Sequence, residues 1–473
     1  MVFFSAVSRL CLLPAPPFVR LLSPHKPLRF SSKQSFLGLS PCKSSLKAPT
    51  FRSFSFNSKG THSIRENSTA ADDNLIVLGI ETSCDDTAAA VVRSNGEILS
   101  QVISSQSDLL AKYGGVAPKQ AEEAHSLAID QVVQEALANA KVNETDLSAV
   151  AVTIGPGLSL CLRVGVQKAR RIAGTFNLPI VGVHHMEAHA LVARLVDKEV
   201  QFPFMALLIS GGHNLLILAL DLGQYIQLGT TIDDAIGEAY DKTAKWLGLD
   251  LRRSGGPAIE ELAREGDPES IKFSVPMQQH KDCNFSYAGL KTQVRLAIKS
   301  KNINVEVPIA LATDEDRKLR ADLAASFQRV AVRHLEERCR RAIEWALEIQ
   351  PSIKHLVVCG GVASNEYVRA RLRCVSDKSG LKLVCPPPKL CTDNGVMVAW
   401  TGIEHFRVGR FDPPPPKPEH EDQNAILDLR PRWPLGDEYE RGKSEARSLK
   451  TARVHPSLTS LIRASILQQQ SSL

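Results

Sequence analysis

Three histidines within six residues form the densest group of metal-ligating side chains in this sequence. They occupy positions 184, 185 and 189, where a predicted strand ends and an apolar-periodic helix begins. On a helix, His185 and His189 are four residues apart and share one face, whereas His184 is rotated away. Two imidazoles on one face could bind a metal ion. The alternative is a solvated helix start, but three of thirteen histidines in so short a stretch favour metal.

Glu187 stands between these histidines, but not where a zinc protease of the H-E-x-x-H type has its general base. It follows His185 by two residues instead of one, and two residues turn a helix by about 200°. Its carboxylate is therefore expected to point away from the His185/His189 face, which argues against a metalloprotease. A third ligand must come from elsewhere, and Asp393, after a strand and a Pro-rich turn, is the candidate. The alternative for Asp393 is an ordinary helix cap.

Four glycine-bearing turns follow predicted strands, at residues 155–157, 210–213, 254–257 and 360–365. Glycines let backbone N–H groups approach a ligand, and the helix amino termini behind such turns favour anions. Together with Asp85, Asp86 and Asp241, these turns predict a nucleotide held in a cleft between two lobes. The turns have neither the Walker spacing nor the G-x-G-x-x-G fingerprint.

The elements that must position these groups follow a repeated pattern. Strands alternating with helices predict a mainly parallel sheet covered on both faces. The first half has predicted strands over 75–80, 88–92, 97–102, 149–154 and 180–183, and helices over 119–140 and 162–176. The second half begins again, with strands over 206–209, 214–220, 356–359 and 381–385 and helices over 233–247 and 321–349. Two halves that each open with a polar-tipped hairpin indicate an internal duplication.

Length and charge divide the chain further. The 473 residues predict two or three folding units, and no stretch approaches the roughly 18 apolar residues of a membrane span. Residues 1–65 hold ten of the 57 basic residues and no acidic one, so the remaining chain has 47 bases against 51 acids, a net charge of −4. We therefore expect any nucleic-acid surface to be a local patch. Most basic clusters, such as those at 168–171, 317–320 and 338–341, are interpreted as solvated helix faces.

The basic leader, rich in Ser, Leu and Phe, has the composition of an organellar transit peptide, with the mitochondrion favoured over the plastid. A secretory signal is the alternative, but Arg9 interrupts its apolar run. Eight cysteines beyond the leader include no C-x-x-C pair, so neither a disulfide framework nor a thiolate zinc site is indicated. The expected division is a disordered transit peptide (1–70), an N-terminal lobe (75–203), a C-terminal lobe (204–405) whose last helix can pack on the first lobe, and a Pro-rich, charged tail (406–473) that serves as a linker or a surface wrap.

Seven ordered motifs between about Leu75 and His405 closely resemble one family, the universal tRNA N6-adenosine threonylcarbamoyltransferases, formerly called O-sialoglycoprotein endopeptidases. The motifs are Gly79–Ala88, Gly155–Leu158, His184–His189, Leu208–His213, Glu238–Lys245, Phe285–Thr292 and Gly360–Asn365. With the transit-like leader, the chain resembles the organellar branch. The resemblance implies the duplicated α/β fold of actin, sugar kinases and Hsp70, an RNase H-like architecture with a nucleotide cleft between its lobes.

The same resemblance implies the residues of the site. It makes His185, His189 and Asp393 the ligands of one divalent metal ion per subunit, with Fe, Zn and Mn not distinguished. It places threonylcarbamoyl-AMP at Leu208, Ile209, Ser210, Gly211, Gly212, Asp241, Gly256, Glu260, Ser364 and Asn365. The segment before Gly256 is about two residues longer than the bacterial pattern, which makes Gly256 and Glu260 less secure than Asp241.

The implied reaction moves threonylcarbamoyl from its adenylate to the N6 amine of the adenosine 3′ of the anticodon in tRNAs that read ANN codons. The adenylate is already activated, so no Ser or Cys nucleophile is required. The group that accepts the amine proton is left open among Glu187, Asp86 and a metal-bound water. Implied partners are tRNA, a separate synthase that supplies the adenylate, and a second copy of the chain in a homodimer. The alternatives are an ATP-dependent kinase of the same fold, which would use Glu81, Asp85 or Asp86 with magnesium, a metal-dependent glycoprotease, and a non-catalytic RNA-binding scaffold.

Overall fold

The structure is a computed structural model that describes residues 74–106, 117–251, 254–303, 305, 307–417 and 428–447. All of these belong to one compact unit, Asn67–Leu473. The predicted transit peptide, residues 1–70, lies outside the described residues, so it stays a prediction. No helix among the described residues is long and apolar enough to cross a membrane.

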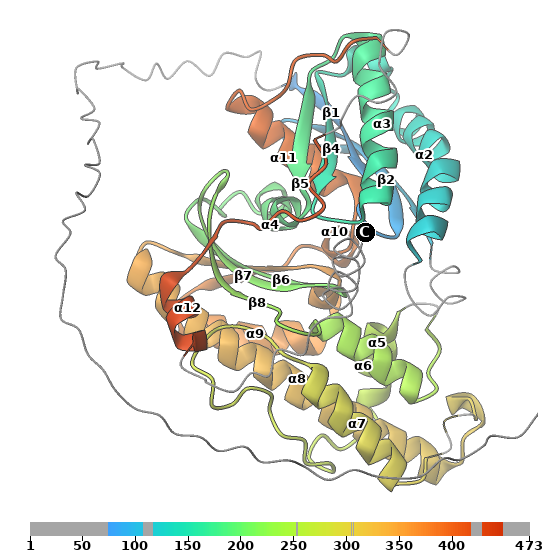
Figure 1. The fold of residues 1–473 in the computed structure, drawn as a ribbon, viewed down its shortest axis with the longest axis vertical. Coiled ribbons are helices and arrows are strands. Elements are labelled where there is room, and N and C mark those ends of the chain that lie inside the picture. Colours follow the sequence, from blue (N-terminus) through green and yellow to red (C-terminus); the bar gives the residue numbers. More distant parts are fainter. Residues whose placement is uncertain are drawn as a thin grey trace, which may run out of the picture. The chain divides into compact units, whose positions relative to one another are not determined.

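The first sheet has the strand order β3-β2-β1-β4-β5 (Figure 1). Strands β1 to β3 form an antiparallel meander, and β4 and β5 run parallel to β1. Asn95 and Gly96 turn β2 into β3, as the Asn-Gly pair predicts. The elements of this half are β1 (Ile76–Glu81), β2 (Asp86–Arg93), β3 (Ile98–Ser105), α2 (Pro118–Ala140), η2 (Glu144–Asp146), β4 (Ala149–Gly155), α3 (Ser159–Phe176), β5 (Ile180–His184) and α4 (His185–Val196).

The second sheet repeats this topology, with the order β10-β9-β6-β7-β8-β11. Strands β6 to β8 form the meander, and β9 and β10 run parallel to β6. The predicted duplicated α/β fold of the actin and sugar-kinase type is therefore confirmed. The strands are β6 (Phe204–Ile209), β7 (Asn214–Asp221), β8 (Gln224–Thr230), β9 (His355–Cys359), β10 (Lys382–Val384) and β11 (Asp437–Glu438).

Helices cover both faces of each sheet. The helices of the second half are α5 (Ile236–Trp246), α6 (Gly255–Ala263), α7 (Ala288–Ser300), η3 (Ile309–Leu311), α8 (Asp314–Ile349), η4 (Gly361–Ser364), α9 (Glu366–Lys378), α10 (Pro388–Cys391), α11 (Gly395–Arg407) and α12 (Glu440–Arg447). One core packs α2 and α3 on the first sheet, and a second core places α4 and α11 between the two sheets. A third core packs α5 to α9 on the outer face of the second sheet.

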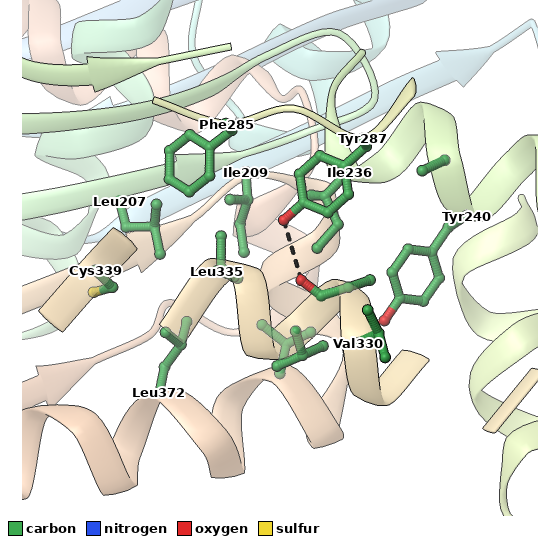
Figure 2. Packing of buried hydrophobic residues seen from close by; sticks show 14 of the residues in the cluster. Leu207, Ile209, Ile236, Tyr240, Phe285, Tyr287, Val330, Leu335, Cys339 and Leu372 are labelled. Carbon is green, nitrogen blue, oxygen red and sulfur yellow. Dashed lines mark hydrogen bonds between the residues drawn. The ribbon is translucent and has the colours of Figure 1, made fainter. Parts of the chain in front are cut away.

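Helix α8 organises the third core. Its residues Val330, Leu335 and Cys339 pack with Leu207 and Ile209 of β6, and the Tyr287 hydroxyl donates a hydrogen bond to the Ala331 carbonyl at 3.2 Å (Figure 2). The helix begins at Asp314, seven residues before the predicted start. The Thr313 hydroxyl caps it by accepting the Asp316 N–H, and three acidic residues follow in the first turn.

The second described part of the tail, residues 428–447, packs along both halves. The Arg430 N–H donates to the Ile154 carbonyl at 2.8 Å, and the Trp433 carbonyl lies 3.0 Å from His184 Nε2. Leu435 is 5% exposed in the core between the sheets, and β11 then extends the second sheet beside β8. The role of the tail as a linker or a surface wrap stays a prediction.

Candidate functional site

Two imidazoles and a carboxylate converge where β5, α4 and the start of α11 meet. The Nε2 atoms of His185 and His189 lie 3.7 Å and 3.0 Å from the same oxygen of Asp393. Each of the three residues offers one ligand atom, and these three atoms lie within 4.8 Å of one another. The two rings meet edge to face, with centroids 4.7 Å apart. His189 and Asp393 thus come together although they are 204 residues apart in the chain. The spacing of the two histidines predicts their part of this group.

Glu81 and Ser83, at the end of β1, hold the first of these rings in place. His185 Nδ1 lies 3.2 Å from Glu81 Oε2 and 3.1 Å from Ser83 Oγ. Glu81 is itself fully buried and accepts hydrogen bonds from the Ser83 N–H and the Thr153 hydroxyl, both at 2.5 Å. A carboxylate on the far ring nitrogen fixes the tautomer of a metal-ligating histidine and raises its basicity. This arrangement leaves Nε2 of His185 facing Asp393.

The charges of this cluster are strongly linked. Burial disfavours the imidazolium, but the carboxylates of Asp393 and Glu81 outweigh it and raise the pKa of His185 to about 9. Burial likewise opposes ionisation of Asp393, yet the charge of His185 and the hydrogen bond from His189 lower its pKa to about 2. The protein therefore holds two carboxylates in their charged form around a cationic centre. A divalent cation satisfies the same charge pattern.

Glu187 is turned away from this cluster, as its spacing predicts. Its Oε1 accepts hydrogen bonds from the Tyr225 hydroxyl at 2.6 Å and the Gly223 N–H at 3.2 Å, and its Oε2 lies 2.9 Å from His405 Nε2. Burial opposes ionisation, but the contact with His405 lowers the pKa of Glu187. Both oxygens are thus occupied on the side of α4 that faces α11 and the β7-β8 turn. This orientation argues against Glu187 as the general base, whose identity stays a prediction.

Asp86, the other candidate base, begins β2. Its Oδ1 atom is buried without a hydrogen-bond partner among the described residues. Burial and the neighbouring charge of Asp85 raise the pKa of Asp86 to about 7, and the charges of Asp393 and Glu81 contribute in the same direction. A carboxyl group with this pKa can accept a proton at neutral pH.

Two glycine turns lie side by side next to the histidine cluster. The turn after β6 is closed by a hydrogen bond from the Ser210 N–H to the His213 carbonyl at 2.9 Å, and its two glycines are exposed. Gly360, after β9, has a φ of +94°, and a Cβ there would lie 2.3 Å from the Ile209 carbonyl oxygen. Only glycine fits this approach. The Cys359 Sγ, one residue earlier, contacts the His189 carbonyl at 2.6 Å, which joins the turn to α4.

Asp241, Gly256 and Glu260 are also expected to bind the adenylate, and hydrogen bonds connect their helices. The Asp241 carboxylate accepts the Gly255 N–H at 2.7 Å, and Glu260 accepts the Glu366 N–H at 2.8 Å. Asp241 is partly buried, and this burial raises its pKa. Gly256 is open, since a Cβ there would meet nothing within 4 Å. Helices α5, α6 and α9 thus bring their expected residues to one rim.

Four of the expected adenylate residues use their side chains elsewhere. The side chains of Leu208 and Ile209 are buried in the hydrophobic cores, so only their backbone can face a ligand. Asn365 caps α9 by accepting the Val368 N–H at 2.9 Å, and its amide donates to Gln328 at 3.2 Å. The Ser364 hydroxyl donates to the Gly361 carbonyl at 2.6 Å. Adenylate binding at these four positions stays a prediction, and at Leu208 and Ile209 it would use the backbone.

Sequence reasoning missed the supporting role of Glu81 and Ser83. The available signal was their place directly at the end of a buried strand, where side chains of a parallel sheet gather around a ligand. His184 was left without a role, and the structure gives it one. Its Nδ1 accepts the Met186 N–H at 3.1 Å and so caps α4, while burial lowers the pKa of His184 to about 4. It is therefore a neutral capping residue.

Comparison with known proteins identifies the family of this chain. The profile of the family described as TsaD, tRNA N6-adenosine threonylcarbamoyltransferase, matches residues 97–400. A probable mitochondrial tRNA N6-adenosine threonylcarbamoyltransferase of Arabidopsis thaliana is 76% identical over 399 residues, which cover 84% of this chain and 83% of the relative. The tRNA N6-adenosine threonylcarbamoyltransferase of Rhizobium etli is 45% identical (77% and 95% covered), and the mitochondrial one of Xenopus tropicalis is 44% identical (71% and 83% covered). The chain therefore belongs to the family of tRNA N6-adenosine threonylcarbamoyltransferases.

Proposed function

We propose that this protein transfers the threonylcarbamoyl group from threonylcarbamoyl-AMP to the N6 amine of the adenosine 3′ of the anticodon in tRNAs that read ANN codons. Membership of the family supports the reaction. The observation that carries the proposal is the convergence of His185, His189 and Asp393 beside the two glycine turns, at the carboxyl ends of β5, β6 and β9. The carboxyl ends of parallel strands are where α/β sheets bind ligands.

The three convergent residues fit a divalent metal ion. Both Nε2 atoms face one carboxylate oxygen, and the Glu81 carboxylate contacts Nδ1 of His185, as carboxylates typically do on the other ring nitrogen of a metal-bound histidine. Two imidazoles with a carboxylate suit Fe, Zn or Mn better than Mg. When bound, the ion would neutralise negative charge on the phosphate of the adenylate.

The residues of the chain itself account for the remaining chemistry. The N6 nitrogen attacks the carbamoyl carbon, the bond from this carbon to the phosphate oxygen breaks, and AMP leaves with the electron pair. Backbone N–H groups of Gly211, Gly212 and the turn at 360–361 would orient the phosphate and stabilise its charge. We assign the amine proton to Asp86, because the pKa of about 7 suits a general base and Glu187 faces the other way.

The setting follows the same relatives. Two of them are named mitochondrial, and the basic leader has transit-peptide composition, so we place the protein in the mitochondrion. The adenylate would come from a separate synthase, and the active form would be a homodimer. Light scattering of the purified protein tests the dimer. Import of the labelled precursor into isolated mitochondria and plastids tests the compartment.

A reconstituted transfer assay tests the reaction. The full chain is combined with a threonylcarbamoyl-adenylate synthase, threonine, bicarbonate, ATP and unmodified tRNA with an ANN-reading anticodon, and nucleosides are measured by mass spectrometry. We expect modified adenosine with the wild type and none with His185→Ala. Two carboxylate-to-amide changes separate the candidate bases: Asp86→Asn should lower kcat by about 10²-fold or more, and Glu187→Gln should leave kcat within a few-fold. Absence of product from the wild type, with ATP hydrolysed by this chain alone, would support the kinase alternative.

A further inference from the structure

A basic ridge runs outward from the site along α5 and α7. Lys242 and Trp246 lie one and two turns after Glu238 on the same face of α5, and this face packs against α7 (Figure 1). Arg295 of α7 lies over the Trp246 ring, with its guanidinium carbon 5.5 Å from the ring centroid. Lys299 follows one turn later on α7. The α5/α7 ridge is defined here as Lys245, Trp246, Arg295 and Lys299.

The ridge carries net positive charge. At the end of the helices nearest the glycine turns, acids and bases balance: Lys291 contacts Asp234 at 2.9 Å and Glu238 at 3.4 Å, and Lys242 contacts Glu238 at 3.8 Å. Further out, Lys245, Arg295 and Lys299 are exposed. Among the described residues, no carboxylate oxygen lies within 4.0 Å of these three cations. Three exposed cations on two helices that pack together are notable in a chain body whose net charge is −4.

The ridge starts where the adenylate is expected. The Gly237 N–H donates to the Ser210 carbonyl at 3.2 Å, so the first turn of α5 touches the glycine turn after β6. Asp241 follows on α5, and Lys245 lies one turn beyond it. A ligand that reaches from the glycine turns along α5 therefore passes from the adenylate site directly onto the ridge.

We propose that the α5/α7 ridge binds the tRNA substrate, with Lys245 and Lys299 on backbone phosphates and the Trp246–Arg295 pair beneath an unstacked base of the anticodon loop. This inference rests on the proposed function and adds the surface that holds its substrate. Single-stranded RNA is typically bound by cations that follow its backbone together with aromatic or Arg planes that stack on bases. Aromatic and cationic groups meet here at the end of the helix that carries Asp241.

A pair of charge-matched variants tests the ridge. The ridge variant combines Lys245→Ala, Arg295→Ala and Lys299→Ala. The control variant combines Lys354→Ala, Arg373→Ala and Lys378→Ala, which removes the same three charges from exposed residues. Lys354 precedes β9 and the other two lie in the last half of α9, so all three are near the end of the second sheet opposite the glycine turns. Because every substituted side chain is exposed, both variants should melt at the temperature of the wild type.

Binding of unmodified tRNA with an ANN-reading anticodon is measured by fluorescence anisotropy at 50 to 200 mM salt. Each lost phosphate contact lowers the slope of log Kd against log salt by about 0.7, so the ridge variant, which loses the phosphate contacts of Lys245 and Lys299, should lose about 1.4 from this slope. Its Kd should rise roughly tenfold near 100 mM salt, and its KM for tRNA should rise while AMP binding stays unchanged. A variant with Lys245→Arg and Lys299→Arg should bind as the wild type does.

The outcomes separate this inference from the proposed function. If the ridge variant and the control variant have the same Kd and salt slope, the ridge does not bind tRNA, even where the wild type makes modified adenosine. If the wild type makes no modified adenosine but the ridge variant alone loses tRNA binding, the proposed reaction is wrong and the RNA surface stands. Loss of binding in both variants to the same extent would reduce the effect to net charge and overturn the assignment.

Discussion

The proton on His185 provides a direct test of the proposed metal site. The carboxylates of Asp393 and Glu81 overcome the effect of burial and raise the pKa of His185 to about 9. An imidazole ligates metal in its neutral form, so a metal ion at Nε2 has to displace this proton. The group is protonated below its folded-state pKa, and metal affinity should therefore fall as the pH is lowered. We expect about a tenfold loss per pH unit below pH 9, or about 100-fold between pH 8 and pH 6.

The interval from pH 7.5 to pH 8.5 distinguishes this histidine from an ordinary one. With a pKa of about 9, affinity should rise about eightfold across the interval, whereas a pKa of about 6.5 gives a rise of only about 10%. Glu81→Gln removes one of the two charges that hold the proton. This variant should therefore have a lower His185 pKa and a flatter pH profile, while its amide oxygen can still accept the Thr153 hydroxyl hydrogen bond.

Titration calorimetry with Zn²⁺ and, separately, Mn²⁺ measures the metal affinity and the number of protons that metal binding releases. Repeating each titration in two buffers of different ionisation enthalpy gives the number of protons released per metal ion. We expect about one proton from His185 at pH 7.5 in the wild type and fewer in Glu81→Gln. Release below about 0.2 proton, with affinity constant from pH 7.5 to pH 8.5, would show that the carboxylates do not hold a proton on this ring and would refute the reasoning.

Three further predictions concern stability. The pKa of Asp86 is about 7 in the fold and about 3.9 when unfolded, so the folded state binds more protons between these values and loses stability as the pH rises through them. Asp86→Asn should therefore melt at a higher temperature than the wild type at pH 8, and a lower melting temperature there would contradict this. Gly79→Ala places a Cβ 2.3 Å from a carbonyl oxygen of α11 and should lower the free energy of urea unfolding by about 3 kcal/mol. Gly289→Ala in α7 meets nothing within 4 Å and should raise it by about 0.5–1 kcal/mol; equal effects of the two variants would refute the close packing of Gly79 on α11. Leu435→Ala should cost about 2–5 kcal/mol by chemical denaturation, and an unchanged midpoint would mean that the tail does not pack.

The first meander, the hairpin of β6 and β7 and the glycine turns were predictable because they depend on local signals. Alternating strands and helices, the Asn95-Gly96 turn and the apolar runs before Glu81 and Ser210 are readable without tertiary information. Other elements were missed for a physical reason. Strand β8, helix α6 and helix α7 mix polar with apolar residues, so packing in the core of the second sheet, more than their own periodicity, stabilises them.

The sequence by itself determined which side chains could bind metal, since the four-residue spacing of His185 and His189 sets one helix face and the two-residue offset of Glu187 turns it away. Only the tertiary structure decided what surrounds them. Asp393 reaches the cluster because α11 packs on the first sheet. Glu81 reaches His185 because β1 pairs with β4, and β4 pairs with β5, which leads into α4. Contacts between residues about 100 to 200 positions apart depend on the register of strands and the packing of helices. These long-range terms have no signature in the local sequence.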